Sequence, residues 1–308
     1  GIAGGGGLYS HATDSLRRFA ESTGIGVAET QAGKGSLPFD HPQYLGAIGV
    51  TGGLAANRVA READVIIVVG SRLSDFTTAS RTAFQHPSLR VIAINVAELD
   101  AHKAGAWPLV GDARVTLDEL LQHLEGYRSP AAYRDEVSRL RDEWTAEIDR
   151  MIAPRGAATP SQHEVLGLLN RFVAPTDVIV CAAGSLPGDL HRYWRALRPN
   201  SYHLEYGYSC MGYEVAGGLG VKMADPGHEV YVLVGDGSYL MMAQEIVTAV
   251  QEGLALTIVL LDNSGFSSIG GLSEAVGCGG FGTEYRRRGT ASGLLDGEPI
   301  AVDFAANA

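Results

Sequence analysis

Glycines and oxygen-bearing side chains gather directly after three apolar stretches in the second half of the chain. Gly184-Ser185 follows the first stretch, Gly235-Asp236-Gly237-Ser238 the second, and Asn263-Ser264-Gly265 the third. Glycine lets backbone N–H groups approach a phosphate closely, and carboxylate and amide oxygens are ligands that Mg²⁺ takes in proteins. These residues therefore predict a site for Mg²⁺ and a phosphate compound.

The spacing of the second and third groups supports one shared site. Asp236 and Asn263 are 27 residues apart, which leaves room for one helix and one returning strand. Such a crossover brings both strand ends to the same edge of a parallel sheet, where open α/β folds bind their ligands. A Gly-Asp-Gly string alone is a weak signal, because Asp-Gly is a common turn dipeptide. The order strand, Gly-Asp-Gly-Ser, helix, strand, Asn-x-Gly is a much stronger one.

The apolar pattern predicts the elements that hold these groups in place. Strands are expected at 25–28, 64–70, 90–95, 177–181, 229–234 and 256–261, and helices at 10–22, 54–62, 113–124, 127–150, 161–172 and 239–251. Strands so rich in Val and Ile, buried on both faces, are typical of parallel sheets with crossover helices. We therefore expect an α/β fold with two doubly wound parallel-sheet domains in series.

The domain boundary is expected at a segment rich in Pro, Gly and Ala. We assign a central Rossmann-like domain to 1–126, a charged helical segment and linker to 127–158, and a second domain, which carries the site, to 159–308. The charged helix is expected to face solvent, with partner binding as the alternative. The chain starts without Met and stops where an apolar stretch begins. We therefore expect a fragment of a longer protein with its last domain cut short.

Composition excludes several classes of protein. The net charge of −11 and the pI near 5.3 argue against nucleic-acid binding, which needs a clustered basic face. Three widely spaced cysteines offer neither a disulfide framework nor a metal knuckle, which favours a reducing, cytoplasmic location. No apolar run reaches the roughly 18 residues of a membrane span, so no membrane partner is expected.

The ordered motifs resemble those of the thiamine-diphosphate-dependent enzymes, whose pattern is Gly-Asp-Gly, a crossover and a paired Asn. Here Asp262 replaces the first Asn, while Asn263 keeps the metal-ligand position. The string 206–213 matches the family segment that contacts the aminopyrimidine, and Met211 matches the apolar residue that wedges the cofactor into its V shape. The resemblance implies thiamine diphosphate and Mg²⁺ as cofactors, with Asp236, Asn263 and the Gly265 carbonyl as metal ligands. The cofactor-binding residues that it implies are Gly184, Ser185, Ser209, Cys210, Met211, Gly212, Gly235, Asp236, Gly237, Ser238, Asn263, Gly265 and Phe266.

Longer strings resemble one branch of this superfamily, the trihydroxycyclohexane-dione hydrolases of inositol catabolism. The strings are 184–190, 205–217, 262–266 and 281–286, and the first domain is similar to the family's central domain at 33–35, 41–42 and 49–53. The resemblance implies hydrolytic C–C cleavage of 3D-(3,5/4)-trihydroxycyclohexane-1,2-dione to 5-deoxy-glucuronate. One alternative is a 2-keto acid decarboxylase or ligase similar to acetohydroxyacid synthase. Another is a non-catalytic dinucleotide-binding module, although no GxGxxG with its acidic partner is present.

The catalytic residues of such an enzyme are not assigned within this sequence. The resemblance places the activating glutamate in an N-terminal domain that the sequence lacks, so we assign that role to none of four local glutamates, Glu205, Glu214, Glu245 and Glu284. It also implies a homodimer or homotetramer. Lone histidines at 41, 163, 191 and 203 are expected to be structural, and Arg286-Arg287-Arg288 to lie in a solvated loop.

Overall fold

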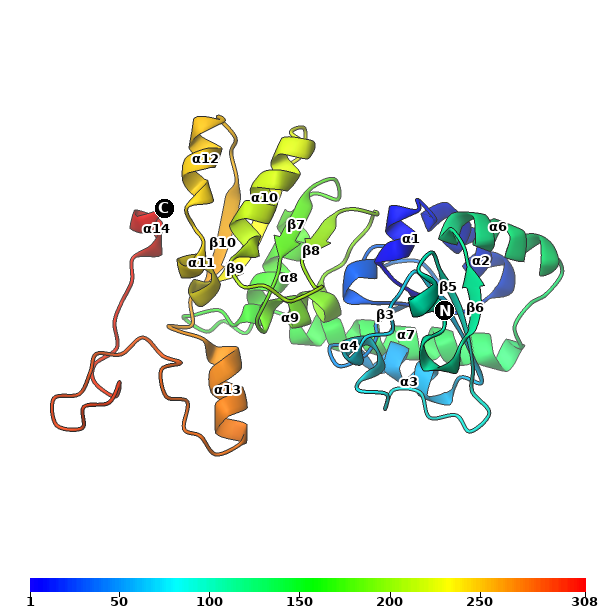
Figure 1. Cartoon of the computed structure of the whole chain (residues 1–308), viewed down its shortest axis with the longest axis horizontal. Helices are drawn as coiled ribbons and strands as arrows, with labels where there is room; N and C mark the ends of the chain where they lie inside the picture. The colour runs from blue at the N-terminus through cyan, green and yellow to red at the C-terminus, as the bar shows by residue number, and fades with distance from the viewer. The chain divides into compact units, whose positions relative to one another are not determined.

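The chain folds into two compact units. The computed structural model describes residues 1–308 (Figure 1). Unit 1 comprises Gly1–Pro175 and Asp189–Tyr202, and unit 2 comprises Thr176–Gly188 and His203–Ala308. None of the helices combines the length and the hydropathy that a bilayer-spanning segment requires.

Unit 1 contains a six-stranded parallel sheet in the order β3-β2-β1-β4-β5-β6. This is the doubly wound order in which the strand sequence reverses at β1 and β4. The strands are β1 (Ile2–Ala3), β2 (Val27–Glu29), β3 (Tyr44–Ala47), β4 (Val65–Val69), β5 (Arg90–Asn95) and β6 (Trp107–Val110). The helices are α1 (Gly5–Tyr9), α2 (Thr13–Thr23), η1 (Gln31–Gly33), α3 (Leu54–Glu62), α4 (Asp75–Thr78), α5 (Glu98–Ala101), η2 (Lys103–Gly105), α6 (Ala113–His123), α7 (Ala131–Met151) and α8 (Gln162–Phe172).

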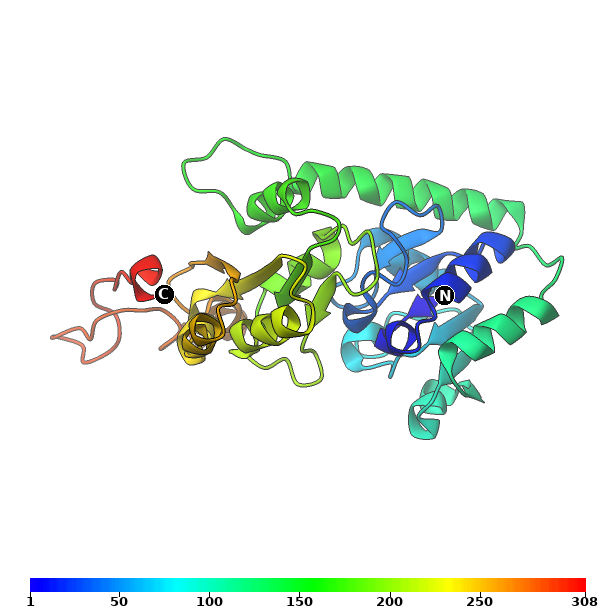
Figure 2. The same ribbon diagram turned by 90° about the horizontal axis from the view of Figure 1, so that it is seen from above.

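Helices cover both faces of this sheet because successive strand residues point to opposite sides. Val68 lies in a core with α3 and α7, whereas Val69 lies in a second core with α2 and α6. Figure 2 shows α7 and α6, both drawn in green tones, on opposite sides of the unit 1 sheet. The expectation of strands buried between two helical layers is therefore confirmed for unit 1.

The glycine cluster after β1 is required for close packing of backbones. The Gly4 N–H donates to Val69 O at 2.8 Å, and the Gly6 N–H donates to Gly70 O at 2.9 Å. A Cβ atom on Gly4 would lie 2.4 Å from the carbonyl oxygen of Gly70, so a side chain does not fit there. This contact explains the cluster without a bound dinucleotide.

Unit 2 contains a four-stranded sheet in the order β10-β9-β7-β8, in which β9 runs parallel to both of its neighbours. Val178 and Val180 of β7 pair with Val230 and Val232 of β9, and these four side chains pack on α10. The strands are β7 (Val178–Cys181), β8 (Tyr202–Leu204), β9 (Val230–Gly235) and β10 (Thr257–Leu261). The helices are α10 (Tyr213–Ala224), α11 (Asp236–Met241), α12 (Glu245–Gln251), α13 (Ser267–Ala275) and α14 (Phe304–Asn307), and α9 (Leu186–Tyr193) contains the division between the units. The expected fold class, two α/β parallel-sheet domains, is confirmed.

The helix predicted at 239–251 is wrong, because the chain breaks there into α11 and α12. Met242 ends the first helix with φ −151° and ψ 58°. Its side chain lies over Gly212, where an added Cβ would meet Met242 Cβ at 3.0 Å. Val247 and Val250 of α12 are exposed, so the apolar residues of this segment are not all buried.

Helix α8 belongs to unit 1, although the boundary expected at 158/159 places it in the second domain. The segment 153–160 is exposed and has no regular structure, as a linker would. However, Gly167 lets α8 pack against the end of α7, since a Cβ on Gly167 would lie 2.2 Å from Ile152 O. The chain therefore first passes from unit 1 to unit 2 after Pro175.

Candidate cofactor site at the sheet edge of unit 2

The predicted chemistry-bearing groups follow neighbouring strands of one sheet. Gly235, the last residue of β9, pairs with Leu261, the last residue of β10. Asp236 and the segment from Asp262 to Gly265 therefore leave the sheet side by side. Gly184-Ser185 follows β7, the neighbour of β9 on the other side, and is exposed. The carboxyl ends of three strands thus bring together residues that lie far apart in sequence.

Asp236 is the most distinctive group at this edge. Its side chain is fully buried, and its Oδ2 accepts the Gly265 N–H at 2.8 Å. Its Oδ1 is also buried and has no hydrogen-bond partner. Burial raises the pKa of Asp236, although N–H groups of Gly265, Asn263 and Gly237 act to lower it. A buried carboxylate oxygen without a partner is costly, and a hard divalent cation would satisfy it. The residue therefore fits the predicted magnesium site.

The segment from Asp262 to Gly265, which carries the other predicted metal ligands, is held by a short antiparallel contact. The Ser264 N–H donates to Asp262 Oδ1 at 2.8 Å, so Asp262, the residue that departs from the family pattern, forms the turn. The Tyr285 N–H donates to Ser264 O at 2.9 Å, next to the bridge between Gly265 and Glu284. A Cβ on Gly265 would lie 2.1 Å from the carbonyl oxygen of Thr283. Glycine at 265 is thus required by the close approach of a backbone.

Tyr285 is a neighbour of this site that sequence reasoning did not single out. Burial and the negative charge of Asp236 raise the pKa of Tyr285 to about 12. Its ring packs edge-to-face on Phe266, with centroids 6.0 Å apart. A Cβ on Gly237 would touch the same Phe266 ring at 2.6 Å. The strand pairing that brings 283–285 to 264–266 gives no signal in the local pattern.

The loop expected to meet the aminopyrimidine is shaped by Glu205. Its carboxylate accepts the N–H groups of Tyr208 at 2.9 Å and Cys210 at 2.7 Å. Partial burial acts to raise the pKa of Glu205, but these N–H donors outweigh it and leave the pKa lowered. Ser209 takes a left-handed conformation with φ 55°, and Met211 is half-buried. Glu205 is thus a loop-forming residue.

The side chain of Ser238 has two partners within the protein. Its hydroxyl donates to Glu214 Oε2 at 2.7 Å and accepts the Gly212 N–H at 2.7 Å. Only 3% of the residue is exposed. Because the only hydroxyl proton is used inside the protein, the side chain has none left to donate to a phosphate. If Ser238 binds the cofactor, as predicted, we expect the contact to be made by its backbone N–H and not by its hydroxyl.

Two of the glutamates and one of the histidines considered above pair with other side chains of the protein. Glu245 accepts the Thr248 hydroxyl within the first turn of α12, and Glu284 pairs with Arg286 in the exposed loop of basic residues. His163 contacts Asp189 at 3.1 Å. No group of three or more His, Cys, Asp and Glu side chains is arranged to hold a metal ion. The magnesium site predicted here depends instead on one carboxylate, one amide and one backbone carbonyl.

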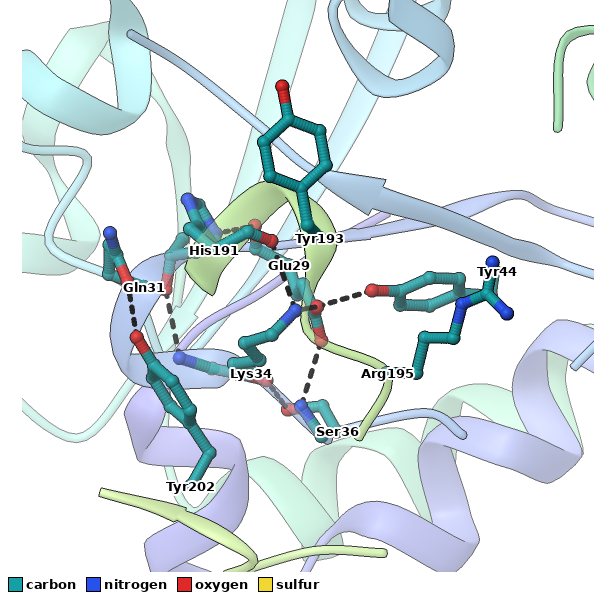
Figure 3. A network of polar contacts seen from close by, with 12 residues as sticks. Glu29, Gln31, Lys34, Ser36, Tyr44, His191, Tyr193, Arg195 and Tyr202 are labelled. Atoms are coloured by element: carbon teal, nitrogen blue, oxygen red, sulfur yellow. Dashed lines mark hydrogen bonds and ion pairs between the residues drawn. The ribbon is translucent and has the colours of Figure 1, made fainter. Parts of the chain in front are cut away.

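A buried polar network in unit 1 was not predicted from the sequence (Figure 3). Lys34 Nζ lies 2.8 Å from Glu29 Oε1 and 3.0 Å from the carbonyl oxygen of His191, and both charged side chains are buried. Glu29 also accepts the Tyr44 hydroxyl and the Gly35 N–H. Burial, followed by the charge of Lys34, lowers the pKa of His191 to about 3. The network fastens the loop after β2 to the segment of α9 that belongs to unit 1.

A hollow in unit 1 is lined by residues other than those of the predicted site. It measures about 690 Å³ and is lined in part by Gly53, Arg58 and Trp144. None of the residues predicted to bind cofactor or metal lines it.

Comparison with known families identifies both parts of the chain. Residues 2–120 match the model of the thiamine pyrophosphate enzyme central domain, and residues 182–308 match that of the C-terminal TPP binding domain. Thiamine pyrophosphate is another name for thiamine diphosphate. The chain belongs to the thiamine pyrophosphate enzymes.

Individual relatives are similar over the whole chain. A 3D-(3,5/4)-trihydroxycyclohexane-1,2-dione hydrolase of Bacillus cereus (strain AH820) is 43% identical over 331 aligned residues, which include all of this chain and 51% of the relative. Proteins of the same name from Bacillus thuringiensis (strain Al Hakam) and Clostridium tetani (strain Massachusetts / E88) are 43% and 42% identical with the same coverage. The chain thus spans about half the length of the curated relatives it matches.

Proposed function

We propose that this chain forms the central and cofactor-binding domains of an enzyme that hydrolyses a C–C bond of 3D-(3,5/4)-trihydroxycyclohexane-1,2-dione with the help of thiamine pyrophosphate and Mg²⁺. The observation that carries the proposal is the carboxylate of Asp236, which lies buried where β9 ends and whose Oδ1 has no hydrogen-bond partner. It occurs in a chain 43% identical to proteins named as that hydrolase.

Different residues of unit 2 would bind the metal, the diphosphate and the pyrimidine of the cofactor. Asp236 Oδ1, the Asn263 amide oxygen and the Gly265 carbonyl would hold Mg²⁺, and glycine backbones at 184, 235 and 237 would surround the diphosphate. The loop from Ser209 to Gly212, with Met211, would lie along the pyrimidine. When bound, thiamine pyrophosphate supplies a carbon nucleophile and an electron sink. The activating glutamate of the family is assigned to no residue of this chain.

The proposed net reaction consumes one water molecule. The bond between the two adjacent carbonyl carbons breaks, and the oxygen of water ends in a carboxylate on one of them. The other carbon takes up a proton and becomes an aldehyde, which gives 5-deoxy-glucuronate. Splitting one difficult step into easier ones by covalent catalysis fits this cleavage.

We also propose that the complete protein is a homodimer or homotetramer in the cytoplasm. Apolar side chains on α12, on α13 and directly after α13 support assembly, because they are exposed in the isolated chain: Val247, Val250, Ile269, Leu272 and Val276. Three cysteines without disulfides support a reducing compartment. Sedimentation of the complete protein tests the assembly, and a monomer at micromolar concentration would contradict it.

The decisive experiment offers the complete protein two substrates in parallel. With thiamine pyrophosphate and Mg²⁺ present, the cyclic dione should be opened to an acid, while pyruvate should release no CO₂. Release of CO₂ and formation of acetolactate from pyruvate, with the dione unchanged, would indicate an enzyme similar to acetohydroxyacid synthase. Tight binding of NAD, without Mg²⁺-dependent binding of thiamine pyrophosphate, would indicate a dinucleotide-binding module.

A further inference from the structure

A carboxylate for which the cofactor chemistry has no assigned use lies buried beside the site in unit 2. Glu214, in the first turn of α10, is 1% exposed. Its Oε2 accepts the Gly212 N–H at 3.0 Å and the Ser238 hydroxyl at 2.7 Å. Its Oε1 accepts the Ala183 N–H at 3.4 Å. The Gly212 N–H also reaches Ser238 Oγ at 2.7 Å, which closes a triangle of polar groups.

The three partners of Glu214 belong to three segments of the proposed site. Ala183 precedes Gly184 in the loop after β7, and Gly212 follows Met211 at the start of α10. Ser238 lies two residues after Asp236 in α11. Helix α10 packs against β7, β9 and α11, so it is central among these segments (Figure 1). The Glu214 carboxylate therefore connects three segments: the Ser209–Gly212 loop, the Gly-Asp-Gly-Ser motif at 235–238 and the loop after β7.

The conformation of Gly212 explains why a carboxylate from the first turn of α10 holds it. Its φ of 89° lies in the left-handed region, and an added Cβ would meet Met242 Cβ and Cγ at 3.0 Å. A side chain is therefore strongly disfavoured here, so Gly212 is held through its backbone, and its N–H donates to both Glu214 and Ser238. The carboxylate of Glu214 takes that N–H at the N-terminus of α10, where a negative charge is also favourable.

The placement of Glu214 is unusual for a residue that only fills space. A buried carboxylate pays a desolvation cost that an apolar side chain avoids. No Lys, Arg or His nitrogen forms an ion pair with Glu214, so only neutral N–H and O–H donors compensate its charge. What the carboxylate provides in return is a fixed geometry among three segments, because each donor must point at one of its two oxygens.

We propose that Glu214 is a positioning residue of the cofactor site. It acts through the Gly212 backbone and the Ser238 hydroxyl, and it holds the Met211–Gly212 segment in register with the Gly-Asp-Gly-Ser motif before the cofactor arrives. The proposal rests on the proposed function, since it assumes that these loops bind thiamine pyrophosphate. Preformed loops lose less conformational freedom on binding, so the residue should contribute to cofactor affinity without touching the cofactor.

The test compares Glu214→Gln with a matched control, Glu164→Gln. Glu164 is also a buried glutamate that accepts two backbone N–H groups and a serine hydroxyl, but it caps α8 in unit 1. In the complete protein, calorimetry with saturating Mg²⁺ should give a Kd for thiamine pyrophosphate about 10- to 100-fold weaker in E214Q and unchanged in E164Q. Without cofactor, the Gly212 amide should exchange its hydrogen faster in E214Q than in wild type.

The outcomes separate this proposal from the one on which it rests. Wild-type protein that does not bind thiamine pyrophosphate would overturn the proposed function and this inference together. Wild-type protein that binds, with equal affinity and equal Gly212 exchange in E214Q, would overturn the inference alone, as would an equal loss of affinity in E164Q. If E214Q does not fold, Ser238→Ala provides the test, because it removes one corner of the triangle. Wild-type exchange at Gly212 in that variant would also overturn the inference.

Discussion

Substitutions in the buried Lys34–Glu29 pair test how much this ion pair contributes to the free energy of unfolding of unit 1. Removal of one partner from a buried ion pair typically costs about 3–5 kcal/mol, because the other charge is left without compensation. The two substitutions should not be equivalent. Lys34→Met leaves Glu29 with the Gly35 N–H and the Tyr44 hydroxyl, whereas Glu29→Gln leaves the Lys34 ammonium with the His191 carbonyl and a neutral amide. We expect K34M near the lower end of this range and E29Q near the upper end.

A double-mutant cycle isolates the pair itself. The variant with both substitutions should be more stable than the sum of the two losses predicts, by about 2–3 kcal/mol, because neither charge is then left alone. The Tm of unit 1 should fall by roughly 6–12 °C in K34M, for a loss of about 3 kcal/mol, and by roughly 10–20 °C in E29Q, for a loss of about 5 kcal/mol.

The assay follows from where the fluorophores lie. All three tryptophans, Trp107, Trp144 and Trp194, belong to unit 1, so tryptophan emission in urea reports its unfolding. The control is Arg139→Met, which breaks an exposed pair with Glu136 on α7 and should change stability little. Single losses that simply add in the double variant would refute the idea that Lys34 and Glu29 act as one unit.

Further predictions concern the metal and the pH dependence of stability. Asp236→Ala should abolish Mg²⁺-dependent binding of thiamine pyrophosphate in the complete protein. Asn263→Ala should only weaken this binding, because the charged ligand remains. Wild-type affinity in both variants would show that the metal site lies at other residues. Since burial lowers the pKa of His191 from 6.5 to about 3, the unfolded chain takes up this proton first. Unit 1 should therefore lose up to about 4 kcal/mol as the pH falls from 6.5 towards 3, and His191→Gln should remove that part of the dependence. The N–H groups of Ser161 and Arg155 lower the pKa of Glu164 to about 2, so its contribution is complete above pH 4.5 and is lost as the pH falls towards 2. Acid titration of Glu164→Gln by circular dichroism should lack this loss, and a curve identical to that of wild type would contradict the assignment.

The sequence predicted elements well where burial on two faces left a clear pattern. Strands β4 and β5 have long runs of Val and Ile, and their bounds agree with the expectation to within a residue or two. Helix α3 agrees with its predicted range. Short strands such as β1 and β3 have too few residues for any periodicity. The break at Met242 was missed because local spacing does not reveal it; in the structure Met242 packs next to Gly212, which is 30 residues earlier in the sequence.

The candidate site was predictable only as far as topology dictates it. Asp236 and Asn263 follow adjacent parallel strands, so their proximity follows from the crossover rule. The hydrogen bonds of the Ser238 hydroxyl to Glu214 and Gly212 depend on how α10 and α11 pack, and residue spacing does not predict that packing. The role proposed for Glu214 was missed for the same reason. The Lys34–Glu29 pair was missed for a similar reason, since an isolated Gly-Lys-Gly string is equally compatible with an exposed lysine.

The discontinuity of unit 1 has a consequence for recombination between relatives. The chain leaves unit 1 after Pro175 and returns to it from Asp189 to Tyr202. That returning segment carries His191, whose carbonyl accepts a hydrogen bond from Lys34. A chimera joined once at the linker 153–160 would therefore combine a Lys34 loop from one parent with a 189–202 segment from another. Viable hybrids should need that segment to come from the parent that supplies the first domain, so the exchangeable module is not a contiguous stretch of the gene.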